Sequence, residues 1–207
     1  VWMNKQGWKR SVLKCFDRLI GYCSSMALAD SGSQRDFLIK ERVISSRKIS
    51  VIGAGSICGV DSKRFFPSAE IRNKIRNDLK IAQDAKVILF VGRLNHDKGV
   101  LDLAMAFGAI SQKYSNVVML LVGSEENVSV QQLLLMCGEG GERMRYVNFT
   151  SHPESYMKAA DVFCLPSYRE GFGLTLIEAA ACGLPAVASR IYGIVDAVEE
   201  GKTGLLF

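Results

Sequence analysis

The chain has 207 residues, of which 48% are hydrophobic and 23% charged, a composition typical of a globular protein with one or two domains. No run of about 18 uncharged apolar residues occurs, so no membrane-spanning helix is predicted. The net charge of +5 is uneven: residues 1–80 carry 16 Lys and Arg against 7 Asp and Glu, whereas residues 81–207 carry 10 against 14.

The six cysteines, at positions 15, 23, 58, 137, 164 and 182, form no C-x-x-C pair, and the two histidines are His96 and His152. This pattern lacks metal-ligand spacing, so no metal is expected. Residues 1–10 have no apolar core of a signal peptide, and the cysteine usage is typical of a reducing compartment. A cytoplasmic location is therefore predicted.

The first third of the chain contains one predicted strand–helix pair, at 26–31 and 33–43, followed by the strand KISVI at 48–52. This strand leads into a loop with glycines at 53, 55 and 59. Their spacing is one residue longer than the dinucleotide-binding fingerprint, and the following VDSKRFFP has no helical pattern. The loop is therefore predicted not to bind a dinucleotide.

Short β-branched runs then alternate with amphipathic segments, a pattern that predicts an α/β fold with a doubly wound parallel sheet. The predicted strands are 86–92, 116–123, 145–149, 161–165, 185–189 and the terminal 204–207. The predicted helices are 69–79, 100–114, 130–137 and 174–182. Because Pro67 and the stretch 59–67 suggest a joint, residues 1–62 are predicted to be the tail of one domain and 63–207 most of a second.

Three joints of this second domain follow strands, where an open parallel sheet binds its ligands. In VGRLNHDKG (91–99), Arg93 and Lys98 flank a turn into a helix, an arrangement that suits a pyrophosphate or two solvated surface cations equally well. In LPSYREGFGLTLIEAAACGLP (165–185), Glu170 lies at the mouth of a helix and Glu178 within it. The third joint, around Gly193, is interpreted as structural.

Glu178 lies beside the apolar stripe of its helix, where a carboxylate is costly unless it accepts hydrogen bonds, and vicinal ribose hydroxyls are suitable donors. The alternative, a solvated Glu178 and a helix-start acid at Glu170, is equally compatible with this segment alone.

In order and spacing, these motifs resemble the donor-nucleotide half of the retaining GT-B glycosyltransferases of glycosyltransferase family 4, the group 1 glycosyltransferases. The resemblance covers nearly all of residues 24–207. It is carried by E-GFGLTLI-E (170–178) with AAACGLPAVAS after it, by VGRLNHDKG, by LLVGSEE and by the closing GI-D-V-EG-TGLLF. It implies a Rossmann-like donor domain at 63–207, truncated at its C-terminus, preceded at 1–62 by the tail of an acceptor-side domain and the interdomain linker.

The resemblance also implies roles for single residues. Arg93, Lys98 and Glu170 would form the catalytic set: the two cations would contact the donor diphosphate and Glu170 the sugar hydroxyls. Glu178 would hold the ribose hydroxyls. The residues that would contact the sugar, the phosphates or the base are Gly171, Phe172, Gly173, Leu174, Thr175, Gly123, Val147 and Thr150. Gly53 and Gly55 would form a hinge loop beside the cleft.

The implied reaction is hexosyl transfer, with retention, from a UDP- or GDP-sugar to a saccharide or a lipid-phosphate-linked acceptor, without cofactor or metal and without nucleic acid. The basic N-terminal region would suit a peripheral contact at the inner face of the membrane. Acceptor-side catalytic groups would lie outside the chain, which would then bind donor but barely catalyse transfer alone.

Two other functions share this shape: a nucleotide-sugar 2-epimerase and a non-catalytic nucleotide-sugar-binding module. The paired glutamates favour the transferase. The sequence departs from the family pattern at Thr150, where relatives often have glycine, and at Cys182, where they often have methionine.

Overall fold

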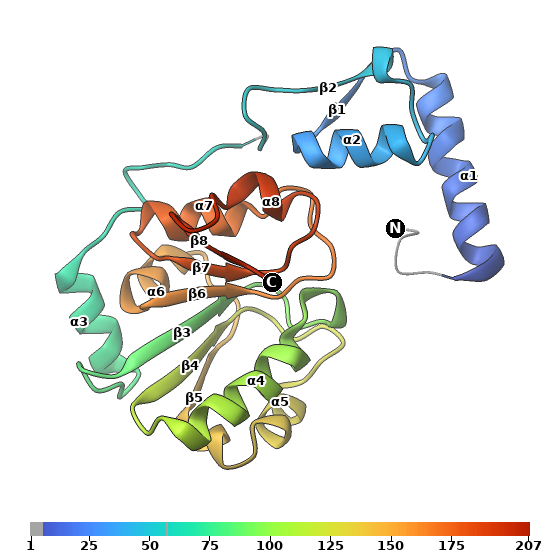
Figure 1. Ribbon diagram of the computed structural model, residues 1–207. Helices are drawn as coiled ribbons and strands as arrows, with labels where there is room; N and C mark the ends of the chain where they lie inside the picture. Colours follow the sequence, from blue (N-terminus) through green and yellow to red (C-terminus); the bar gives the residue numbers. More distant parts are fainter. Residues whose placement is uncertain (1–5, 57) are drawn as a thin grey trace. The chain divides into compact units, whose positions relative to one another are not determined.

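The computed structural model describes residues 6–56 and 58–207, which divide into two compact units at the Cys58–Gly59 bond (Figure 1). The sequence placed its boundary four residues later, after residue 62. None of the helices formed by the described residues combines the length and the apolar character that crossing a membrane requires.

The described residues of the first unit form a two-stranded parallel sheet and two α-helices. Its elements are α1 (Gly7–Cys23), β1 (Ala27–Ala29), α2 (Gly32–Lys40) and β2 (Ile49–Val51). The predicted strand–helix pair and the KISVI strand are thereby confirmed. The buried core of this unit is small and consists of Ala29, Ile44 and Ile49.

Helix α1 was not predicted from the sequence. It packs against the segment after α2 through Gly21, where an added Cβ would lie 2.7 Å from the Val43 carbonyl oxygen. Lys14 forms an ion pair with Glu41, and Arg18 Nε donates to the Arg42 carbonyl at 3.1 Å. The apolar residues Trp8, Val12, Phe16, Leu19 and Ile20 of α1 recur at helical spacing, and their side chains are exposed.

The second unit is a six-stranded sheet in which every pair of neighbours is parallel, in the order β5-β4-β3-β6-β7-β8. Its strands are β3 (Lys86–Val91), β4 (Val117–Val122), β5 (Met144–Val147), β6 (Val162–Leu165), β7 (Ala186–Ala188) and β8 (Gly204–Leu206). All six predicted strands of this domain and its predicted fold class are confirmed.

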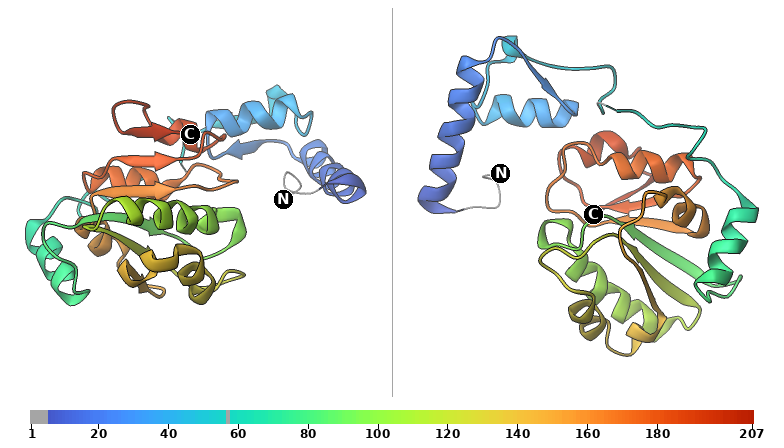
Figure 2. Two further views of the ribbon diagram at one scale, coloured as in Figure 1. Left: turned by 60° about the horizontal axis from the view of Figure 1, so that its bottom comes forward. Right: turned by 180° about the vertical axis from the view of Figure 1, so that it is seen from behind.

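Helices lie on both sides of this sheet (Figure 2). They are α3 (Ala69–Asp78), α4 (Val100–Lys113), α5 (Val130–Cys137), α6 (Pro153–Ala159), α7 (Leu174–Ala181) and α8 (Ile194–Ala197). The four helices predicted in this region are present, whereas α6 was not singled out.

The strand order reverses direction between β3 and β6. From β3 the chain moves to β4 and β5 on one side, and then crosses to β6, β7 and β8 on the other. At such a switch point, connections leave neighbouring carboxyl ends toward opposite faces of the sheet, which opens a place for a ligand between them. The loops after β3 and β6 therefore define the first region in which to look for a site.

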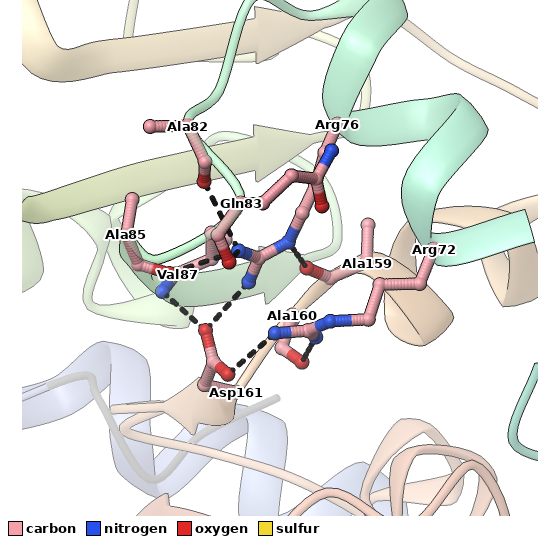
Figure 3. A network of polar contacts seen from close by, with 9 residues as sticks. All are labelled: Arg72, Arg76, Ala82, Gln83, Ala85, Val87, Ala159, Ala160 and Asp161. Atoms are coloured by element: carbon pink, nitrogen blue, oxygen red, sulfur yellow. Dashed lines mark hydrogen bonds and ion pairs between the residues drawn. The ribbon is translucent and has the colours of Figure 1, made fainter. Parts of the chain in front are cut away.

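A buried polar network fixes the opposite, amino-terminal edge of β3 and β6 (Figure 3). The Arg76 side chain of α3 is fully buried; it pairs with Asp161 Oδ2 at 2.7 Å and donates to the carbonyls of Ala82, Gln83, Ala85 and Ala159. Arg72 pairs with Asp161 Oδ1 at 2.8 Å, and the Val87 amide donates to Asp161 Oδ2 at 2.7 Å.

The Asp161 carboxylate thus pairs with two arginines of α3. Burial alone would raise the pKa of Asp161, but the Val87 amide and the two guanidinium groups outweigh it, and the net shift is downward.

Replacing Asp161 with Asn should lower the stability of the second unit by about 3 kcal/mol, because the Arg76 guanidinium stays buried without its counter-charge. Thermal unfolding followed by circular dichroism at neutral pH measures this. The matched control is Asp78→Asn at the exposed end of α3, which should change stability by less than about 0.5 kcal/mol. Equal effects of the two substitutions would contradict the structural role given to the network.

Candidate functional site

The loops after β3 and β6 meet at the switch point through a close backbone contact. Gly99, at the start of α4, has a φ of 65°, and an added Cβ would lie 2.0 Å from the Pro166 carbonyl oxygen. The Tyr168 amide donates to the Asp97 carbonyl at 2.8 Å, and the Tyr168 hydroxyl donates to Asp102 Oδ2 at 2.7 Å. Two segments about 70 residues apart in the chain are therefore held in one place.

This contact brings together two of the three predicted catalytic residues. Lys98 Nζ forms an ion pair with Glu170 Oε1, and the buried Ser167 hydroxyl donates to the same oxygen at 3.0 Å. Both charged side chains are mostly shielded, with 23% of Lys98 and 12% of Glu170 exposed. A lysine so placed offers an anion a partly desolvated positive charge, and its carboxylate partner offers an acceptor for hydroxyl groups.

The third predicted catalytic residue, Arg93, extends from the start of the same loop in a different arrangement. Its side chain is 63% exposed, and it pairs with Glu126 Oε1 at 3.0 Å. Asn95 Nδ2 donates to the other oxygen of Glu126 at 2.5 Å, and Asn95 Oδ1 accepts from the Lys98 amide at 2.9 Å. Asn95 thereby connects the Arg93 pair to the turn that presents Lys98.

The glycine-rich segment 171–173 leads directly into α7. Gly173 precedes the helix with a φ of 75°, so it adopts the left-handed conformation that glycine tolerates. The amides of the first helical turn, at Leu174 and Thr175, have no partner within the helix ladder and are available to an anion. Phe172 is partly buried beside them.

The joint around Gly193, interpreted as structural, packs against this segment. An added Cβ at Gly193 would lie 2.6 Å from the Gly171 carbonyl oxygen and 2.9 Å from that of Glu170. The loop after β7 therefore supports the backbone of the loop after β6.

Glu178 lies on α7 within a half-buried environment. Burial raises the pKa of the Glu178 carboxyl, the Arg64 guanidinium acts to lower it, and the carboxylate of Glu154 raises it further. In the described part of the chain Glu178 forms no ion pair, in contrast to Glu170. The predicted choice between a shielded and a fully solvated Glu178 is therefore decided in favour of the shielded one.

The residues predicted around the base lie at the ends of β4 and β5. The Gly123 amide donates to the Val147 carbonyl at 2.9 Å, and an added Cβ at Gly123 would lie 2.0 Å from the Gly92 carbonyl oxygen. Thr150 Oγ1 accepts from the His152 amide at 3.0 Å, which shapes the turn before α6. Their role toward a base stays a prediction.

Gly53 and Gly55 belong to the first unit. Their φ values are 55° and 108°, and the Gly55 amide donates to the Ile52 carbonyl at 3.0 Å, so the predicted tight turn is present. The described residues from Gly59 to Ser68 form no helix, as predicted, and a pyrophosphate would find no helix N-terminus there. The hinge role stays a prediction.

Several residues of the site were missed by sequence reasoning: Ser167, Asn95, Glu126, Arg64 and Glu154. Asn95 carried a usable signal, because an asparagine three residues before Lys98 is typical of a turn cap. Ser167 donates to Glu170 only three positions away, but a lone serine carries no distinctive pattern. Glu126, Arg64 and Glu154 act through partners more than 25 residues away, which local patterns do not reveal. Among the described residues, no group of three or more His, Cys, Asp or Glu is placed to hold a metal ion.

A doubly wound parallel sheet with a lysine, glycine-rich turns and a helix N-terminus at its switch point is typical of nucleotide-binding α/β proteins. Residues 71–207 match the model of the family described as glycosyl transferases group 1. The chain belongs to this family.

Two curated relatives show the level of similarity. The capsular polysaccharide biosynthesis glycosyltransferase CapM of Staphylococcus aureus is 30% identical over 97% of this chain, which covers 53% of CapM. The D-inositol 3-phosphate glycosyltransferase of Corynebacterium jeikeium is 36% identical over 72% of this chain, which covers 38% of that enzyme. The chain thus spans about half, or less, of the relatives it matches.

Solved structures agree with this assignment. Anabaena HepE in complex with UDP and glucose has a TM-score of 0.80 and 25% identity, covering 95% of this chain and 53% of HepE. Sucrose-phosphate synthase from Thermosynechococcus elongatus has a TM-score of 0.79 and 28% identity, covering 98% of this chain and 49% of the synthase. The neighbours are GT-B glycosyltransferases, which confirms the predicted fold family.

Replacing Gly99 with Ala should destabilise the second unit by about 3 kcal/mol, since the left-handed backbone and the contact with Pro166 both resist a Cβ. Gly201→Ala is the matched control, because Gly201 also has a positive φ, of 80°, but nothing lies within 4 Å of its added Cβ. Thermal unfolding of the two variants isolates the contact between the loops. A Gly99 variant no less stable than the Gly201 variant would contradict this close approach.

Proposed function

We propose that this chain is the donor-binding part of a retaining glycosyltransferase that transfers a hexose from a nucleoside diphosphate sugar. The observation that carries the proposal is the Lys98–Glu170 pair, joined to Ser167 at the mouth of α7. It combines, at one switch point, a shielded cation for a phosphate, a carboxylate for sugar hydroxyls and free helix amides. Membership of the group 1 family supports the transfer reaction.

In the proposed mechanism, Lys98 and Arg93 stabilise the negative charge that develops on the leaving diphosphate. Both cations are paired with carboxylates in the unliganded chain, Lys98 with Glu170 and Arg93 with Glu126. An incoming diphosphate would exchange part of this pairing for its own oxygens. Glu170 would then be free to accept hydrogen bonds from the donor sugar, and Glu178 from the ribose.

Retention and independence from metal are part of the proposal. The acceptor would enter on the same face of the sugar as the departing phosphate, which would help to take up the acceptor proton. No residue of the second unit is assigned as a nucleophile.

The donor nucleotide and the acceptor are proposed from the relatives. HepE is described in complex with UDP and with UDP-glucose, which favours UDP as the nucleotide here. CapM is described in capsular polysaccharide biosynthesis, which favours a saccharide or lipid-phosphate-linked acceptor. A cytoplasmic protein with a peripheral membrane contact through its basic first 80 residues fits such an acceptor.

Calorimetric titration of the chain with UDP, GDP, ADP and NAD tests the donor site. One nucleoside diphosphate should bind with a dissociation constant between micromolar and millimolar, and Glu178→Ala should weaken it by about tenfold, or about 1.4 kcal/mol. Glu139→Ala, which removes an exposed carboxylate of the same domain, is the matched control and should bind like wild type. Equal binding of NAD by wild type and the Glu178 variant would instead identify a dinucleotide site and refute the proposal.

A second prediction concerns turnover. Incubated with the nucleotide sugar that it binds and a saccharide acceptor, the chain should release nucleoside diphosphate at a rate barely above the uncatalysed reaction, because the acceptor-side groups are proposed to lie in the other part of the protein. Chromatography of the products also detects any epimer of the donor sugar. Rapid transfer by this chain would contradict the proposal that the acceptor-side groups lie in another part of the protein. Formation of an epimer would favour the epimerase.

A further inference from the structure

The first segment of the second unit, before α3, packs firmly against the rest of that unit. Phe65 is 5% exposed and belongs to the main core. Lys158 of α6, itself buried, donates from Nζ to the Arg64 carbonyl at 3.1 Å and lies 3.9 Å from the centroid of the Phe66 ring. The backbone at Arg64 is therefore fixed by α6, and its side chain leaves from a defined position.

The Arg64 side chain joins this segment to the turn between β5 and α6. Its terminal nitrogen donates to the Ser151 carbonyl and pairs with Glu154 Oε2 at 2.7 Å. Glu154 is 9% exposed, and its other oxygen lies 3.1 Å from His152 Nδ1. One guanidinium thus ties down the loop 148–152, in which the base-contact candidate Thr150 lies.

The same guanidinium also acts on Glu178. Of the charged groups that act on the Glu178 carboxyl, Arg64 is the attractive one and Glu154 the repulsive one. Arg64 therefore serves two carboxylates at once: Glu154 on α6, by direct contact, and Glu178 on α7, by charge attraction.

We propose that Arg64 is a positioning residue of the donor site, which fixes the loop 148–152 and is the shared counter-ion of Glu154 and Glu178. The inference rests on the proposed function, since Glu178 and this loop are assigned there to the ribose and the base. Arg64 acts through these groups and contacts no reacting atom.

The physical reason is the cost of placing two carboxylates near one another in a shielded place. Without a cation between them, one of the two tends to take up a proton. A protonated Glu178 would lose acceptor capacity toward the two ribose hydroxyls. Arg64 allows both groups to stay ionised while the site is empty.

Other charged groups around this cluster must be separated from the effect. Lys158 of α6 acts, with Glu154 and Glu178, on the Cys182 thiol at the end of α7. The exposed imidazole of His152 contacts Glu154. His152→Gln therefore serves as a control that removes this neighbour of Glu154 but leaves Arg64 in place.

The experiment measures the dissociation constant of the nucleoside diphosphate that wild type binds, from about pH 4 to about pH 8, for four variants. Binding should fall on acidification as Glu178 takes up a proton. We call this fall of affinity at low pH the acid limb. Arg64→Ala should move the acid limb up by about one pH unit, because the pKa of Glu178 rises without the cation. The same substitution should also weaken binding at neutral pH by about tenfold. Arg64→Lys should restore most of both.

Glu154→Gln should move the acid limb in the opposite direction, to lower pH. The substitution removes the charge that repels Glu178 and keeps the attractive charge of Arg64. His152→Gln should leave the limb within the error of wild type. If Arg64 had a purely structural role, Arg64→Ala and Glu154→Gln would both weaken binding, and the acid limb would not shift in opposite directions. If Arg64→Ala and Glu154→Gln move the limb in the same direction, or not at all, the inference is overturned.

A measurement without ligand separates this inference from the proposed function. The pKa of the Glu178 carboxyl, followed by carbon-detected NMR in the unliganded chain, should rise in Arg64→Ala and fall in Glu154→Gln. If no nucleoside diphosphate binds wild type, the proposed function fails, and this titration alone then supports or overturns the shared counter-ion. Should Arg64→Ala fail to fold, Arg64→Lys and Glu154→Gln carry the same test.

Discussion

The arrangement of the second unit depends on one buried charge cluster at the amino-terminal edge of the sheet. Asp161 precedes β6, yet it accepts from the amide of Val87 at the start of β3 and neutralises Arg76 from α3. Because strands of a parallel sheet rise by about 3.3 Å per residue, a fixed register at one edge also fixes where the strands end. The cluster therefore sets the positions at which the loops after β3 and β6 emerge at the opposite edge.

The opposite, carboxyl-terminal edge of β3 and β6 is the switch point. The register of these two strands determines which side chains meet there. A residue placed just after β3 and one placed just after β6 become neighbours, although Lys98 and Glu170 are 72 positions apart in the chain. The close approach of Gly99 to Pro166 leaves no room for a side chain between the loops. The buried charge cluster and the proposed binding site thus lie at opposite ends of the same two strands, and open parallel sheets bind their ligands at the carboxyl ends of the strands.

The strands and the starts of the main helices could be predicted from the sequence, because the patterns that indicate them are local. Runs such as KVILF and VVMLLV indicate strands buried on both faces, and the glycine turns before α4 and α7 indicate where helices begin. The strand order, the role of Arg76 and the pairing of Arg64 with Glu154 were not predictable in this way. On its helix Arg76 has the pattern of a surface cation, and its burial depends on Asp161, 85 residues away. Helix α1 was missed although its apolar residues, such as Trp8, Val12 and Phe16, recur at helical spacing.

The two glutamates of the 170–178 motif are placed in contrasting electrostatic surroundings, and this contrast distinguishes what each can do. Glu170 already has Lys98 and Ser167 as partners, so a ligand that binds there must compete for a satisfied carboxylate. Glu178 is shielded by burial and has no ion pair among the described residues; the charge of Arg64 lowers the pKa of its carboxyl and that of Glu154 raises it. A ligand with two adjacent hydroxyls would repay the desolvation of Glu178, whereas a ligand with a negative charge would not. In the proposed function, the anionic part of a donor would therefore bind toward Lys98 and the helix N-terminus, and its neutral polyol parts toward the carboxylates.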